Sequence, residues 1–149
     1  MGINGASNKE IWHTIMNFDF QKSDTVIILW SHDDRHATID IKDDNYIYNR
    51  VHVNNVEKCT RSYYFYKYLH TSVDMNINIH LRCHHIDMHL KNKYNINPYH
   101  CAIYKKYIVN QPEWSNVQFL NRFLNEYRYI PPLALDDHHP GQNAHKAIA

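Results

Sequence analysis

Glycine is scarce in this chain, with 3 Gly among 149 residues. Phosphate-binding loops of nucleotide-binding proteins need clustered glycines, because their backbone approaches the phosphate closely, and no such cluster is present. The glycine-flanked serine of a hydrolase nucleophile elbow is missing as well. So few glycines are also unusual for a chain rich in β-strands or loops.

Paired cysteines, long apolar runs and net charge are missing too. Cys59, Cys83 and Cys101 are odd in number and widely separated, so a reducing intracellular compartment is the simpler interpretation. The longest apolar run, residues 26–30, is far too short to cross a bilayer, and no secretory signal is visible. A formal net charge of +1 gives no electrostatic reason to expect a nucleic acid or an anionic membrane as partner.

Histidine and tyrosine are abundant instead, with 13 and 12 residues. Apolar residues make up 44% of the chain, which is enough for the core of one domain or of a small repeat array. Histidines become charged below their unperturbed pKa of about 6.5, so acid would make the chain strongly cationic. Solubility and stability should therefore depend on pH.

The most informative stretch is residues 97–102, Asn-Pro-Tyr-His-Cys-Ala. Asn97 is a good N-cap, and Pro98 suits a first helical turn because its missing N–H would be unpaired there. The apolar residues that follow have helical spacing, and Pro112 ends the segment. A second helix is predicted from Ser115. The stretch therefore predicts a turn, a helix, a loop and a helix.

This pattern resembles the Thr-Pro-Leu-His-x-Ala signature that opens the first helix of an ankyrin repeat. Residues 39–46 and 86–94 resemble the finger between successive repeats, and Asn95 stands where such a repeat carries a glycine with positive φ. The uneven spacing and the Asn/Ile/Tyr/Lys-rich composition resemble the ankyrin-repeat proteins of poxviruses. By this resemblance, the chain is a degenerate and truncated member of that group.

The resemblance implies a mostly α-helical fold of ankyrin-like helix-turn-helix repeats. Residues 1–132 would form the degenerate repeat region, and residues 133–149 an irregular His-rich tail. Pro98, His100 and Ala102 would then be scaffold residues. A compact α+β domain is the alternative fold class.

Three further segments have local patterns of their own. Residues 8–16 predict a short amphipathic helix, and residues 60–68 a helix dense in Tyr and Phe that could expose one edge to a partner. Residues 24–30 taken alone predict a buried β-strand, because they form a short β-branched run. In an ankyrin array they would form a helix, which is the interpretation we favour.

By resemblance, the implied function is non-enzymatic protein binding, through loop tips such as residues 89–94 and the concave helix surface. The implied partners are host proteins in the host cytoplasm, with no nucleic acid, membrane, cofactor, metal or catalytic residue. About three repeats are needed to bury each other's faces, so a chain without a stable fold is a further hypothesis.

The main rival function is an α+β enzyme. Residues 36–38 and 70–72 both read His-x-Ser/Thr, and two such motifs facing each other in a cleft can polarise a phosphate ester. This pattern is typical of two-histidine phosphoesterases, with His36 and His70 as the reacting groups.

Two other clusters contain residue types that can bind metals, which leaves metal binding as an alternative. The denser one has histidines one helical turn apart that could hold zinc, although no second Cys/His pair has structural-zinc spacing. Its members are His80, Cys83, His84, His85 and His89. The second cluster resembles the metal face of a His-rich nuclease, which makes a metal-dependent nuclease a further alternative. Its members are Asp136, Asp137, His138, His139, Asn143 and His145.

Overall fold

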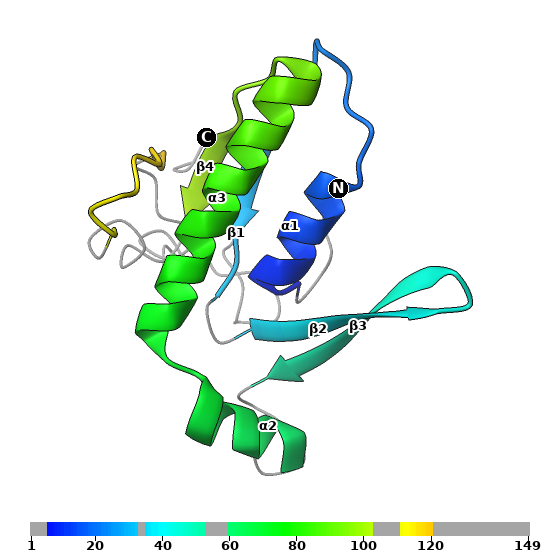
Figure 1. The fold of residues 1–149 in the computed structure, drawn as a ribbon, viewed down its shortest axis with the longest axis vertical. Helices are drawn as coiled ribbons and strands as arrows, with labels where there is room; N and C mark the ends of the chain where they lie inside the picture. Colours follow the sequence, from blue (N-terminus) through cyan, green and yellow to red (C-terminus); the bar gives the residue numbers. More distant parts are fainter. Residues whose placement is uncertain (1–5, 33–34, 53–59, 103–110, 121–149) are drawn as a thin grey trace, which may run out of the picture.

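The computed structural model describes residues 6–32, 35–52, 60–102 and 111–120. The elements in these residues are α1 (Asn8–Met16), β1 (Ile27–Trp30), β2 (Arg35–Lys42), β3 (Asn45–His52), α2 (Thr60–Tyr64), the π-helix η2 (Phe65–Leu69), α3 (Ser72–Tyr94) and β4 (Tyr99–Ala102) (Figure 1). They form an α+β fold with two small sheets. The prediction of a mostly α-helical ankyrin-like array is therefore wrong.

The main correction concerns the segment after Pro98, which forms β4 instead of a helix. β4 pairs in parallel with β1, with Ile28 opposite His100 and Trp30 opposite Ala102. Pro98 directly precedes the strand, where its lack of an N–H costs no ladder hydrogen bond. Pairing with a distant strand has overridden the local helix-start signal. The strand pattern of β1, which we set aside in favour of a helix, was correct.

The two finger-like strings also have other structures. Residues 39–46 belong to an antiparallel hairpin of β2 and β3, whose two-residue turn is formed by Asp43 and Asp44. Both turn residues have positive φ, 50° and 60°, as expected for a type I′ turn, whose twist matches that of the two strands. Residues 86–94 lie in α3, which ends at Asn95 in the left-handed conformation, with φ of 59°. The positive φ at Asn95 ends a helix here instead of opening a repeat.

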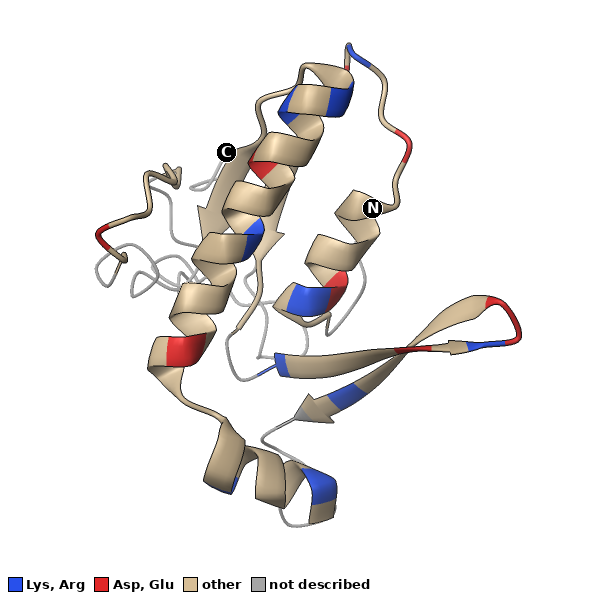
Figure 2. Cartoon of the chain, in the orientation of Figure 1, with Lys and Arg blue, Asp and Glu red and all other residues tan. Residues whose placement is uncertain are grey.

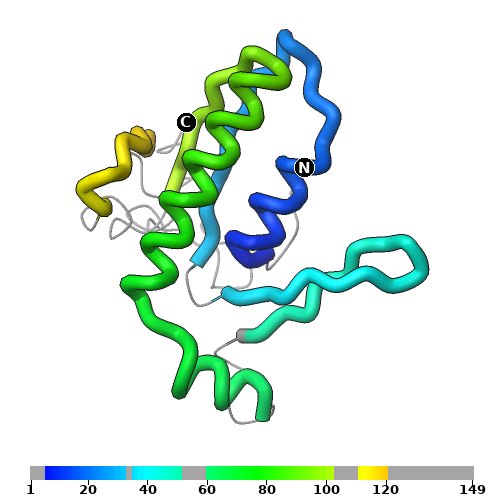
Figure 3. Tube along the Cα trace, in the orientation of Figure 1, coloured from blue at the N-terminus to red at the C-terminus, as the bar shows by residue number. Residues whose placement is uncertain are grey.

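The core lies between α3 and one face of the β1–β4 sheet (Figures 1 and 3). Ile79, Cys83, Ile86 and Leu90 recur every three or four residues along α3 and are all fully buried. Along β1, buried residues alternate with exposed ones, so that Ile28 and Trp30 join this core. Burying one such side chain stabilises the fold by about 1.5–3 kcal/mol.

Two local predictions were confirmed. Residues 8–16 form α1, whose N-cap is Ser7, one residue earlier than the Asn8 that opens the helix. The side chains of Ser7 and Glu10 make a reciprocal capping box, which satisfies two backbone N–H groups at the helix start. Residues 60–68 are helical as predicted, in α2 and η2.

The segment from Ser115 was expected to start a helix. Phe119 is instead in a parallel bridge with His100, so it lies at the outer edge of β4. The remainder of the predicted second helix, Cys59, the tail at 133–149 and the nuclease-like cluster at 136–145 lie outside the described residues.

Candidate functional site

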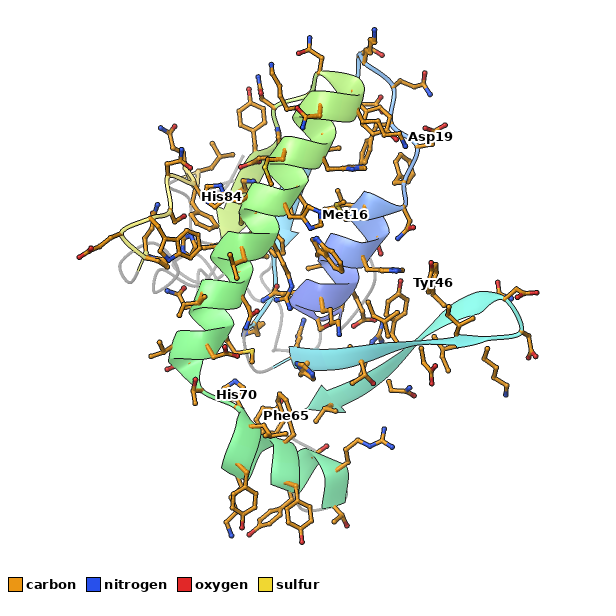
Figure 4. The ribbon with its side chains drawn as sticks, viewed as in Figure 1. Met16, Asp19, Tyr46, Phe65, His70 and His84 are labelled. Atoms are coloured by element: carbon orange, nitrogen blue, oxygen red, sulfur yellow. The ribbon has the colours of Figure 1, made fainter. Side chains whose placement is uncertain are left out.

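The two predicted His-x-Ser/Thr motifs meet at one aromatic ring, that of Phe65. The imidazole of His36 stacks on this ring, with 4.3 Å between centroids and an interplanar angle of 25°. His70 approaches the same ring edge-on, at 6.0 Å and 64°. Phe65 and His70 lie side by side below the β2–β3 hairpin in Figure 4. The fold thus brings together two histidines that are far apart in the sequence.

The π-helix explains the position of His70. The backbone N–H of His70 donates to the carbonyl oxygen of Phe65 at 2.9 Å, which is the wider turn of a π-helix. The hydroxyl of Tyr66 donates to the carbonyl oxygen of Val51 in β3, at 3.1 Å, and so connects η2 to the hairpin. The ring of Tyr66 lies 5.2 Å from that of His70. Two elements therefore hold His70 beside Phe65.

Positive charge surrounds His36. Burial lowers the pKa of His36, and the nearby charges of Lys9, Arg82 and His70 lower it further. Burial also lowers the pKa of Arg82, an effect opposed by Asp74. We call Lys9, His36, Phe65, His70 and Arg82 the His36 site.

These five side chains come from four elements and the residue after η2. Lys9 comes from α1, His36 from β2, Phe65 from η2 and Arg82 from α3, and His70 follows η2 directly. All five are half-buried. Figure 2 shows Lys or Arg at the start of α1, at the start of β2 and midway along α3. The site is therefore a product of tertiary packing, not of one segment.

The hydroxyl groups of the two motifs differ in their roles. Thr38 follows His36 by two residues along β2, so both side chains are on the same side of the strand. In the second motif, the hydroxyl residue Ser72 is the first residue of α3. The middle residue of that motif, Thr71, is the N-cap of α3, and its Oγ1 accepts the N–H of Asp74 at 3.1 Å. The two motifs therefore do not form a symmetric pair.

His100 has a structural role. The indole N–H of Trp30 donates to its Nδ1 at 3.1 Å, so that nitrogen carries no proton. Its Nε2 then carries the proton and donates to a carboxylate oxygen of Asp87 at 2.9 Å. Because both ring nitrogens are engaged, His100 has no nitrogen left for a substrate. It remains a buried scaffold residue, in a strand instead of an ankyrin helix.

The histidines of α3 do not converge on one point. His80 bonds to the hydroxyl of Ser115 at 2.8 Å, while His85 on another side of the helix accepts the indole N–H of Trp12 at 3.2 Å. His84 lies against Trp114, with 5.7 Å between ring centroids. Among the described residues, no group of three His, Cys, Asp or Glu side chains could hold a metal ion. The predicted zinc cluster therefore gains no support from the geometry.

A second surface of interest lies next to the His36 site. Tyr63, Tyr64, Tyr68 and Leu69 are exposed on α2 and η2, with Tyr68 63% and Leu69 69% accessible. We call these four residues the tyrosine surface. Lys67 donates to the hydroxyl of Tyr63 at 2.7 Å and lies over the rings of Tyr63 and Tyr68, about 5 Å from each centroid.

Sequence reasoning found part of the His36 site. The two histidines were identified from their motifs, but Lys9 and Arg82 were not, because no sequence spacing relates them to His36. Phe65 carried no motif either. It stands five residues before His70, and the π-turn of η2 brings the two residues together.

Comparison with protein-family models, with curated proteins and with solved structures finds no significant match. None of the described helices has the length and apolar character needed to span a bilayer. The function of the chain is therefore inferred from the geometry of its own residues.

Proposed function

We propose that the chain binds a phosphate ester at the His36 site and that His36 and His70 act as base and acid in its hydrolysis. The observation that carries this proposal is the meeting of two His-x-Ser/Thr histidines at Phe65, beside Lys9 and Arg82.

Electrostatics support an anionic ligand. Half-buried cations repel one another, and the lowered pKa values of His36 and Arg82 reflect the cost of holding charge there. A phosphate group would offset this repulsion and accept hydrogen bonds from a guanidinium and an ammonium group. The ring of Phe65 offers an apolar contact for the organic part of the ester.

The same arrangement suits acid–base chemistry. A lowered pKa keeps His36 neutral at neutral pH, so it can accept a proton from an attacking water molecule. The water oxygen bonds to phosphorus as the bond to the leaving oxygen breaks. His70 then donates a proton to that oxygen, while Lys9 and Arg82 stabilise the charge on the phosphoryl oxygens.

Two measurements test this proposal. Titration of the full chain with inorganic phosphate should shift the imidazole NMR resonances of His36 and His70. Hydrolysis of p-nitrophenyl phosphate and bis(p-nitrophenyl) phosphate should fall at least about tenfold in His36→Ala and in His70→Ala, a loss typical of removing an acid or base. His85→Ala, on the exposed side of α3, is the matched control and should hydrolyse normally. Equal rates in all three variants would contradict the assignment.

Protein binding, with host proteins as partners in the host cytoplasm, stays a prediction. The described residues do not form the ankyrin surface on which it was placed. The tyrosine surface favours protein binding instead, because exposed aromatic clusters are typical of protein interfaces. Tyr64→Ser with Tyr68→Ser should abolish affinity capture of a partner that the parent chain retains. Capture of the same partner by the double variant would exclude this surface.

A further inference from the structure

A cavity of about 600 Å³ lies between α1 and β1, apart from the His36 site. Apolar side chains form most of its wall, and the main contributors are Ile11, Ile15, Phe18, Phe20, Ile27 and Leu29. Its size is in the range of small-molecule sites, which are mostly apolar with few polar groups.

The strand pattern of β1 explains why this wall is apolar. Ile28 and Trp30 point into the core under α3, so Ile27 and Leu29 point to the opposite side of the sheet. They are 65% and 41% exposed there, and Phe18 is exposed beside them. Apolar side chains of this size gathered in a concave surface are typical of a site that an apolar ligand fills.

The wall of the cavity includes one positively charged side chain, that of Arg35. Its guanidinium donates to the hydroxyl of Ser31 at 3.0 Å. Ser31 is held in place by Asn8, whose side chain exchanges two hydrogen bonds with the Ser31 backbone, at 2.6 and 3.2 Å. The hydroxyl is neutral, and among the described residues no carboxylate forms an ion pair with Arg35.

The acidic group in the wall has a different function. The carboxylate of Asp24 accepts the N–H of Gln21 at 2.8 Å, and the N–H of Asp24 donates to the Gln21 carbonyl at 3.0 Å. Asp24 therefore stabilises a turn. Because its carboxylate would repel an anionic head, the head is expected at Arg35 and not at Asp24.

We infer that this cavity binds a single-chain amphiphile with an anionic head, of the size of a medium-chain fatty acid. The alkyl chain would lie against Ile15, Phe18 and Leu29, and the carboxylate would form a charge-assisted hydrogen bond with Arg35. Arg35 and His36 are neighbours in β2 and point to opposite sides, so the two sites have no side chain in common.

Isothermal titration of the full chain with dodecanoate, below its micelle concentration, tests this inference. Saturable binding is expected, weakened at least about fivefold by Leu29→Ser. Arg35→Gln should weaken binding of dodecanoate to a similar extent while leaving binding of dodecanol unchanged. Leu29 is already part-exposed, so its replacement should leave the fold intact. Leu81→Ser, at an exposed position on α3, is the matched control.

Three outcomes would overturn the inference. The first is no saturable binding, and the second is binding that Leu29→Ser leaves unchanged. The third is a cavity that the protein itself fills. Nuclear Overhauser contacts from Leu29 to residues 121–149 would show that the same chain fills it, and dimerisation that Leu29→Ser abolishes would show that a second copy does. If the parent chain binds no dodecanoate but hydrolyses phosphate esters normally, the result contradicts this site alone, because His36 is outside it.

Discussion

The same residue type has opposite surroundings in the two parts of this fold. Under α3, His100 is buried and both of its ring nitrogens are paired, to Trp30 and to Asp87. Beside the hairpin, His36 is half-buried against Phe65 among positive charges. A histidine that the core fully satisfies is a structural residue. One that the fold holds in unfavourable electrostatics is a candidate for function.

The two parts also differ in how they are packed. The β1–β4 sheet and α3 supply most of the continuous core, whereas α2 and η2 present large aromatic side chains to solvent. Stability should therefore depend mainly on the first part, and the effect of phosphate on His36 and His70 beside Phe65 of η2. Variants in each part test this difference.

The largest effect is expected in the core. Ile86→Ala leaves a cavity under α3 and should lower the free energy of unfolding by about 2–5 kcal/mol. Leu69→Ala, in the exposed tyrosine surface, should change it by no more than about 0.5 kcal/mol. Urea denaturation followed by circular dichroism measures both. Similar losses in the two variants would show that α2 and η2 contribute to the core as much as α3 does.

Removing the hydrogen bond from Trp30 to His100 should lower the free energy of unfolding by a smaller amount. Trp30→Phe keeps most of the apolar volume but leaves Nδ1 of His100 buried without its donor, which should cost about 1–3 kcal/mol. Trp12→Phe is the matched control, because its indole N–H bonds to the exposed His85. Its expected loss in urea denaturation is smaller. An equal loss would show that the buried hydrogen bond to His100 contributes no more to stability than the exposed one to His85.

The sequence predicted those parts of the fold whose signals are local. The helix α1 was found because its apolar spacing lies within a few residues, although the N-cap is Ser7 and not Asn8 as expected. β1 was visible as a short β-branched run. The strand β4 was missed because Pro98 gives a helix-start signal, while the pairing that overrides it comes from β1, far away in sequence. The long α3 was missed because many histidines interrupt its apolar stripe.

In the His36 site, too, only the residues with a local sequence signal could be predicted. His36 and His70 carried a motif, so the sequence could name them as a pair. Lys9 and Arg82 carried none, since only the packing of α1 against both β2 and α3 brings them near His36. The apolar cavity was also unpredictable, because its wall joins the outward side chains of β1 to those of α1.

A modest effect of pH should come from histidines in both parts of the fold. The pKa values of His13, His36 and His89 are lowered, in each case mainly by burial, from a reference of 6.5. Between the lowered values and 6.5 the unfolded chain binds more protons than the folded one, so the free energy of unfolding falls as pH falls through 6.5. Thermal melts between pH 8 and pH 5 should show this fall.

Phosphate should offset that fall, because an anion at the His36 site favours the protonated imidazole. At ten times its dissociation constant it would stabilise the fold by about 1.4 kcal/mol. His36→Ala should remove this effect, and His13→Ala should preserve it. A phosphate effect of equal size in both variants would point to nonspecific salt stabilisation.

The smallest effect concerns the hairpin turn, remote from both parts. Asp43 and Asp44 both adopt positive φ, which costs a residue with a β-carbon more than it costs glycine. Asp44→Gly should therefore stabilise the fold by about 0.5–1 kcal/mol, because Asp-Gly suits this turn type. Asp40→Gly, within β2, is the opposite control and should destabilise, since glycine weakens a strand interior. A destabilised Asp44→Gly would show that the turn carboxylate makes a contact worth more than the backbone strain.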